Sequence, residues 1–104
     1  MSESRLFVVV RTHGGAWKPG LPADQQYDVK GHSDFLNRLL ADGFLVAAGP
    51  LEGTDDAMLL VRARDAEEIR DRLQWDSWSA NDLLRTKSIQ PWGIRFGAIA
   101  ANRP

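Results

Sequence analysis

The chain has 104 residues and a formal net charge of −1, from 13 Lys and Arg scattered among 14 Asp and Glu. With 43% hydrophobic and 26% charged residues it has an ordinary globular composition, so we expect one domain over 1–104 with flexible tails at 1–4 and 99–104. The balanced charge offers no basic stripe for nucleic acid, and the absence of cysteine excludes disulfides, thiolate metal sites and cysteine nucleophiles.

The N-terminal segment predicts a strand followed by a long loop. The stretch LFVVVR is rich in β-branched residues and predicts a first strand over residues 5–12. Its apolar run Leu6–Val10 is too short for a signal peptide or a membrane span, so we expect a soluble cytoplasmic protein. Residues 13–26 carry glycine and proline without helical or strand periodicity, which predicts a loop.

The middle of the chain predicts a helix and two strands. A helix is expected over residues 28–42, because apolar residues recur there at helical spacing and Gly43 follows as a stop. The stretch FLVAAGPL at residues 44–51 predicts the second strand, and AMLLVRA at residues 57–63 predicts the third. The connection over residues 52–55 is short, so these two strands should be antiparallel.

The C-terminal part predicts a second helix and a last strand. Asp65 begins the helix, since its carboxylate can cap the first turn while Glu68 completes a capping box, and the helix ends near Trp75. The stretch SANDLLR at residues 79–85 contains a weaker box and predicts one further helical turn. A last strand is predicted from about Lys87 to Ala98.

The order β, α, β, β, α, β is typical of an α+β, ferredoxin-like fold with a four-stranded antiparallel sheet. Pro50 and Pro91 fall in the second and fourth predicted strands. Proline is tolerated mainly at sheet edges and strand ends, and these two strands are the edges in the usual ferredoxin-like order. The two prolines therefore agree with the fold class.

The first predicted strand is apolar on both faces, because the run Leu6–Val10 is apolar at every position. Two helices can cover only one face of a four-stranded sheet, and a large exposed apolar face usually marks an interface. We therefore predict a homodimer packed sheet to sheet. The alternative is that the loop over residues 13–26 folds over the open face.

A histidine stands on the inner side of the first predicted helix. His32 shares a helical stripe with Phe35, Leu36 and Leu39, so its ring should point towards the protein interior. The positive end of the helix dipole disfavours imidazolium there. A neutral imidazole in a partly dry site suits a general base if an acceptor orients its other nitrogen. A hydrogen-bonded core histidine explains the same position.

Several segments together resemble a known family. His32, FLNRLLADGFLVAAGPL, WDSW and IQPWGIRFG resemble, in this order and spacing, the YciI-like (YCII-related) proteins of the dimeric α+β barrel superfamily. The resemblance covers about residues 28–97. It rests on the helix histidine, on Gly49 and Pro50 after the second strand, on the acidic residue of the aromatic motif, and on the proline–aromatic pair of the last strand.

The resemblance implies a His-Asp pair formed by His32 and Asp76 in a cleft beside the sheet. In that role the carboxylate would orient the imidazole and stabilise its protonated form. Without the family, Asp76 is equally a helix cap for the turn SWSAND. Ser77 stands where the family commonly has proline and offers a hydroxyl to a ligand, whereas Val29 stands where relatives often carry a basic residue.

Other residues are weaker candidates. His13 ends the first strand beside two glycines and reads as a second acid, a metal ligand or a solvated histidine. A metal site from His13, His32 and Asp76 lacks paired histidine spacing, so no metal is predicted. Gly49 allows the close approach of a ligand or serves a turn. The residues predicted to contact a ligand are His13, Gly49, Pro50, Ser77, Trp78 and Trp92.

The expected function is acid–base catalysis without a cofactor, with His32 and Asp76 moving protons on a small cyclic or aromatic metabolite. The resemblance implies this class, because relatives include a dehydrochlorinase acting on a chlorinated hydroxyquinol and lactone isomerases. The alternative is a noncatalytic module in which the same cleft binds a small molecule or the domain assembles with a partner, since one scaffold hosts both.

Overall fold

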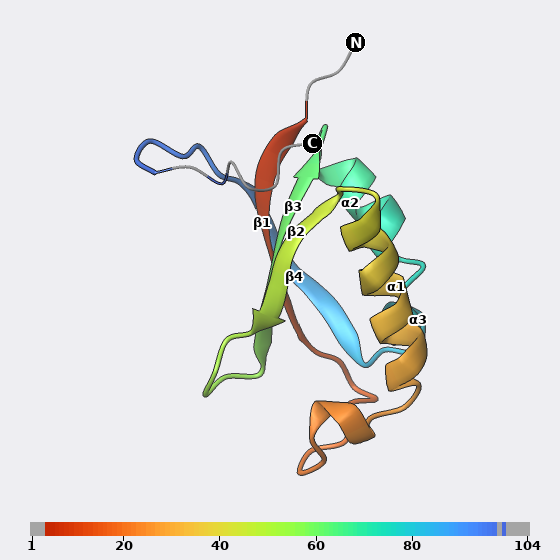
Figure 1. Cartoon of the computed structure of the whole chain (residues 1–104). Coiled ribbons are helices and arrows are strands. Elements are labelled where there is room, and N and C mark those ends of the chain that lie inside the picture. The colour runs from red at the N-terminus through yellow and green to blue at the C-terminus, as the bar shows by residue number, and fades with distance from the viewer. Residues whose placement is uncertain (1–3, 98, 100–104) are drawn as a thin grey trace.

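The computed structural model describes residues 4–97 and residue 99. In this part the chain forms an α+β fold in which the helices lie on one face of an antiparallel sheet (Figure 1). The elements in chain order are β1 (Arg5–His13), η1 (Ala23–Gln25), α1 (Val29–Ala41), β2 (Leu45–Pro50), β3 (Asp56–Ala63), α2 (Ala66–Leu73), α3 (Ser77–Ala80) and β4 (Leu84–Pro91).

The four strands form one sheet in the order β2-β3-β1-β4. Strand β1 pairs antiparallel with both β3 and β4, and β2 pairs antiparallel with β3. Strands β2 and β4 are therefore the edges, as predicted from Pro50 and Pro91. At an edge, the missing proline N–H leaves no ladder hydrogen bond unmade.

Helices α1 and α2 begin and end where local chemistry predicts. Asp28, with φ 51°, caps α1 by accepting from the backbone N–H of Gly31, and Gly43, with φ 84°, follows the last turn. Asp65 caps α2 by accepting from the N–H of Glu68 at 2.9 Å. The carboxylate of Glu68 accepts from the backbone N–H of Arg64, one residue before the cap Asp65. The predicted capping box therefore closes one position upstream.

The last part of the chain differs from the prediction. The prediction of a helical turn at residues 79–85 is wrong. Helix α3 begins two residues earlier, is capped by Asp76 and ends before Asp82, whose φ of 60° is not helical. The last strand begins at Leu84 rather than Lys87 and ends at Pro91. The predicted strand is wrong over residues 92–97, which form no strand, and its predicted end at residue 98 lies outside the described residues.

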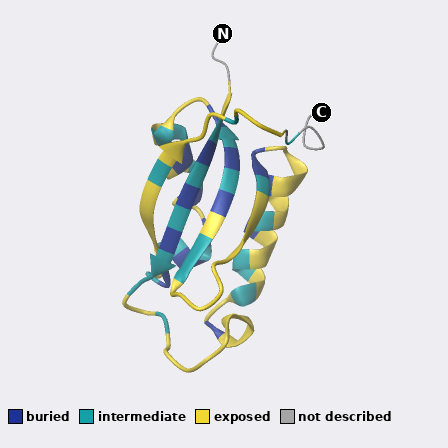
Figure 2. Cartoon of the chain, turned by 90° about the vertical axis from the view of Figure 1, so that its left-hand side faces the viewer, coloured by how far each residue is buried: buried dark blue, intermediate teal, exposed yellow. Residues whose placement is uncertain are grey.

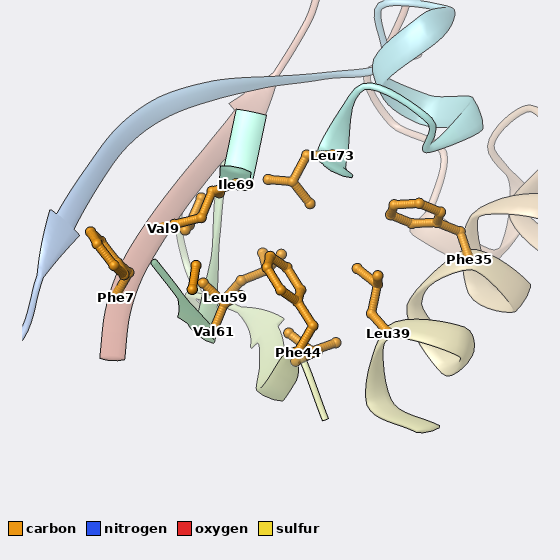
Figure 3. Packing of buried hydrophobic residues seen from close by; sticks show 11 residues of the cluster. Phe7, Val9, Phe35, Leu39, Phe44, Leu59, Val61, Ile69 and Leu73 are labelled. Carbon is orange, nitrogen blue, oxygen red and sulfur yellow. The ribbon is translucent and has the colours of Figure 1, made fainter. Parts of the chain in front are cut away.

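The main core lies between the sheet and the two longer helices (Figure 3). It is built from the inward side of β1 and β3 and from the apolar stripes of α1 and α2, as the alternating and helical periodicities require. Its buried members are Phe7, Val9, Phe35, Leu39, Phe44, Leu45, Leu59, Val61, Ala63, Ile69 and Leu73.

No helix covers the opposite face of the sheet in the described part of the chain (Figure 2), and at one end of this face Arg62 donates to the carbonyl of Ile99. Val8 and Val10 of β1 and Leu60 of β3 are half-buried there, and Met58 is exposed. The loop between β1 and α1 does not fold over this face, contrary to the alternative drawn from the sequence. It lies on the helix side, next to the start of α1 (Figure 1).

This loop is fixed at two places. The buried side chain of Gln26 bonds to the N–H and carbonyl of Lys18 and to the carbonyl of Leu21, which closes the loop on itself. At its start, Gly14 donates to the carbonyl of Leu83 at 2.8 Å. A Cβ at Gly14 would lie 2.3 Å from the carbonyl oxygen of Asp82, so only glycine permits this approach.

Candidate functional site

A cavity of about 430 Å³ opens between the helices and one end of the sheet. This volume falls in the range of pockets that hold small molecules. The wall is largely apolar and aromatic, with Val29, Leu36, Leu59, Trp78 and Leu84 among its residues. Arg11, His13, His32 and Asp55 add polar groups to this wall.

His32 and Asp76 form a close pair beside this cavity. The Nδ1 atom of His32 lies 3.0 Å from each carboxylate oxygen of Asp76. Helix α1 places the ring on its inner stripe, as predicted, and its side chain is 14% exposed. A carboxylate at Nδ1 favours the tautomer with the proton on Nδ1. The neutral ring then has its lone pair on Nε2.

Asp76 is buried and held by several donors. It accepts from the backbone N–H of Trp78 at 3.0 Å, which makes it the cap of α3 as well as the partner of His32. Asp76 therefore contacts His32 and also caps α3. Its second oxygen accepts from Nη1 of Arg11 at 3.0 Å, and neither side chain is more than 2% exposed.

Arg11 connects the sheet to the turn that carries Asp76. Besides its bond to Asp76, it donates through Nη2 to the hydroxyl of Ser79. Its Nε is buried and has no hydrogen-bond partner in the described part of the chain. Because guanidinium stays charged at physiological pH, Arg11 and Asp76 form a buried ion pair behind His32.

Aromatic stacking fixes the plane of the His32 ring. The imidazole lies parallel to the ring of Trp78, with centroids 3.8 Å apart and an interplanar angle of 5°. The indole N–H of Trp78 donates to the carbonyl of Tyr27, so the tryptophan is itself anchored next to the start of α1. Stacking and the bond to Asp76 therefore orient the imidazole before any ligand is bound.

The charge state of Asp76 follows from opposing effects. Burial alone raises the pKa of this carboxyl, because it disfavours the charged form. The hydrogen bond and charge of His32 lower it, and the N–H of Trp78 and the charge of Arg11 add to that effect. The sum holds the pKa of Asp76 below its ordinary value, so the residue is a carboxylate at neutral pH.

A pH dependence of stability follows. Since the pKa of Asp76 is lower in the folded than in the unfolded protein, its pairing stabilises the fold above the unfolded pKa of about 3.9 and is lost as pH falls through the folded pKa. Urea unfolding between neutral pH and the acid limit should show the free energy of unfolding falling more steeply in the wild type than in Asp76→Asn. Equal slopes would contradict the pairing. Asp56 and Asp82, whose pKa values are also lowered, are present in both proteins.

Most of the predicted ligand contacts lie together. His13, Gly49, Pro50 and Trp78 line the same cavity as His32. Asp76 stands behind His32 and is fully buried.

Two predicted contacts do not line this cavity. Ser77 begins α3, and its carbonyl and hydroxyl face the side chain of Asn81. Trp92 follows β4, is 45% exposed, and donates from its backbone to Leu6. Both were predicted from the resemblance alone, and neither is among the lining residues of the cavity.

Among the residues of the site that were missed from the sequence are Arg11, Ser79 and Trp17. Arg11 is the next inward position after Phe7 and Val9 in the alternation of β1, and a charged residue there signals a buried partner. Ser79 accepts from Arg11, although its motif suggested a helix cap. Trp17 lines the cavity from the loop, where no periodicity indicates its direction.

Among the described residues, no group of three or more His, Cys, Asp or Glu side chains could hold a metal ion. None of the helices in the described ranges has the length and apolar character needed to cross a membrane. The cytoplasmic location predicted from the sequence stays a prediction.

Comparisons with known proteins add no relative. No family model, no curated protein and no solved structure matches the chain. The resemblance to YciI-like proteins therefore stays a prediction.

Proposed function

We propose that the protein is a cofactor-independent acid–base enzyme in which His32 and Asp76 move a proton on a small cyclic or aromatic molecule. The observation that carries this proposal is the 3.0 Å contact between Nδ1 of His32 and a buried carboxylate, next to a cavity of about 430 Å³. The assignment agrees with what the resemblance to YciI-like proteins implies.

The chemistry rests on the ring nitrogen that Asp76 does not contact. Within the described residues, the hydrogen bonds of His32 run through Nδ1, which leaves Nε2 for a ligand in the cavity that the ring lines. Nε2 takes a proton from a carbon next to an activating group, and Asp76 stabilises the imidazolium that forms. The buried charge of Arg11 and the start of α1 oppose this positive charge, so the proton can be returned.

The wall of the cavity supports the substrate class. Aromatic and aliphatic side chains dominate it, and a flat ring can pack against them while a few polar groups fix its orientation. Arg11 lines the cavity, but its charge is already paired with Asp76. We therefore favour neutral ring compounds such as lactones, and phenols in their neutral form.

The experiment that tests the function is proton exchange. The protein is incubated in D₂O with α-angelica lactone, a β,γ-unsaturated five-membered lactone, and the loss of the α-proton signal is followed by ¹H NMR. Exchange faster than in buffer alone supports the proposal. No acceleration by the wild type contradicts it for this class of substrate.

A noncatalytic binding module is the second candidate. It is favoured by the apolar lining and by the buried ion pair of Arg11 and Asp76, which connects β1 to α3 and serves the fold whether or not a proton is moved. Saturable binding of ring compounds without any deuterium exchange would support this alternative.

We also propose that the sheet is ferredoxin-like and that two copies pack through its open face as a dimeric α+β barrel. The strand order and the helices on a single face support the first point. Half-buried Val8, Val10 and Leu60 on the uncovered face support the second. The segment after β4 extends on that same side of the sheet (Figure 1), and its Phe96 is 94% exposed.

The dimer is tested by light scattering during gel filtration. The wild type should elute with twice the mass of the 11.6 kDa chain, and Leu60→Glu should elute as a monomer, because it places a charge in the apolar interface. Leu40→Glu is the matched control, since Leu40 lies exposed on α1. A monomeric wild type, or a dimer in both variants, would overturn the proposed interface.

A further inference from the structure

We propose that His13, oriented by Asp55, is a second proton-transfer residue of the same cavity. This inference rests on the proposed role of His32 and extends it from proton removal to the relocation of a proton between two positions of a ligand. Both imidazoles line the cavity, and they come from different elements, β1 and α1.

The strand directs His13 to the site. Side chains two positions apart on a strand point to the same face, so His13 projects to the same side of β1 as Arg11. Its partner in the ladder with β4 is the buried Leu84, which also lines the cavity. The His13 side chain is 29% exposed, twice the value for His32, so it stands nearer to solvent.

The two histidines are held in the same manner. His13 stacks on Trp17 with ring centroids 3.8 Å apart and an interplanar angle of 11°, much as His32 stacks on Trp78. The two tryptophans meet edge to face at 5.5 Å and 89°. The four rings therefore form one continuous wall with an imidazole at each end.

Each imidazole also has a carboxylate at Nδ1. Oδ1 of Asp55, in the turn between β2 and β3, lies 3.6 Å from Nδ1 of His13. The neighbouring Asp56 bonds to Lys87 at 3.0 Å and also feels the charge of His13, but among the described residues Oδ1 of Asp55 is the carboxylate oxygen within ion-pair distance of Nδ1. This contact is longer than the hydrogen bond at His32, but the nearby negative charge favours a proton on Nδ1 of His13 and leaves Nε2 for a ligand.

The surroundings of the two pairs differ in a way that suits two roles. Asp76 is fully buried, whereas Asp55 is 80% exposed. His13, Trp17 and Asp55 also line a neighbouring hollow of about 610 Å³ beneath the loop, so His13 stands between the inner cavity and this outer space. His32 thus lies at the dry end of the site, and His13 can exchange protons with water.

The proposed reaction on a β,γ-unsaturated lactone conserves protons and electrons. Neutral His32 takes a proton from the α-carbon, and the electron pair of that C–H bond enters a conjugated dienolate. Protonated His13 gives a proton to the γ-carbon, which leaves the α,β-unsaturated isomer with the same formula. The protein ends with a proton on His32 and none on His13, and exchange with water restores both rings.

The first test reads the tautomers directly. In ¹⁵N NMR of the wild type at alkaline pH, both imidazoles should carry the proton on Nδ1. Asp55→Ala should shift His13 towards the Nε2–H tautomer and leave His32 unchanged. Asp24→Ala is the matched control, because Asp24 lines the same cavity without an ion pair to His13. A wild-type His13 protonated on Nε2 overturns the proposal.

The second test separates the two proton transfers on α-angelica lactone in D₂O. His13→Phe keeps a flat ring on Trp17; it should lower the ratio of conjugated-isomer formation to α-carbon exchange, both measured in the same sample, by about 10²-fold or more. An unchanged ratio overturns the role of His13. If the wild type neither exchanges nor isomerises the lactone, the proposed function is wrong for this class of substrate. The ¹⁵N NMR measurement of the tautomers decides separately whether His13 and Asp55 form a pair.

Discussion

Asp76→Ala is expected to lower the free energy of unfolding by about 3–5 kcal/mol, the range found when one partner of a buried ion pair is removed. The reason is that Arg11 would keep a buried positive charge without its partner. Arg11 is 2% exposed and its Nε already has no partner within the described residues, so the guanidinium cannot turn to water without disturbing the strand. The α3 cap, worth about 1 kcal/mol in longer helices, is lost as well.

Urea denaturation with two further variants separates this cause from general disruption. Arg11→Met added to Asp76→Ala should recover part of the loss, because it removes the unpaired charge and keeps a side chain of similar length. Asp34→Ala, which removes an exposed pair with Lys30 on α1, should leave stability nearly unchanged. A loss below about 1 kcal/mol in Asp76→Ala, or no recovery in the double variant, would show that water reaches Arg11.

The elements that could be predicted are those whose packing leaves a period in the sequence. Strands β1 and β3 lie in the middle of the sheet, and α1 buries one stripe, so alternation and helical spacing locate all three. Strand β4 is an edge strand whose residues 85–88 are all exposed, and no alternation marks it. The helix boundary before it was missed because Asp76, rather than Ser79, is the cap.

The residues of the candidate site, like the elements, were predictable only where the local sequence carries a pattern. Helical spacing places His32 on the inner stripe of α1, whereas Asp76 came from the resemblance, since its local sequence indicates only a cap. Arg11 could have been found, because it continues the inward alternation of β1. Asp55 could not, because an exposed carboxylate in a turn has the same local sequence whether or not a histidine from another strand lies 3.6 Å away.

His32→Asn is expected to lower the rate of deuterium exchange into α-angelica lactone by roughly 10²–10⁴-fold, the usual contribution of a general base. The asparagine amide can take the position of Nδ1 and still donate to Asp76, but it offers no basic nitrogen to the cavity. Because Arg11 and the N–H of Trp78 continue to hold the carboxylate, the fold should survive with a loss of about 1–2 kcal/mol.

The exchange rate and the thermal midpoint of His32→Asn should be compared with those of His32→Phe. Phenylalanine keeps a flat ring against Trp78, where the imidazole now lies at 3.8 Å, but leaves Asp76 with one donor fewer. Each variant lacks the basic Nε2, so both should lose deuterium exchange to the same extent. They do so although Asn keeps the contact with Asp76 and Phe keeps the contact with Trp78. If either variant exchanges the lactone at the wild-type rate, His32 is not the base. A structural histidine would instead show large losses of stability in both variants and no specific loss of exchange in the folded protein.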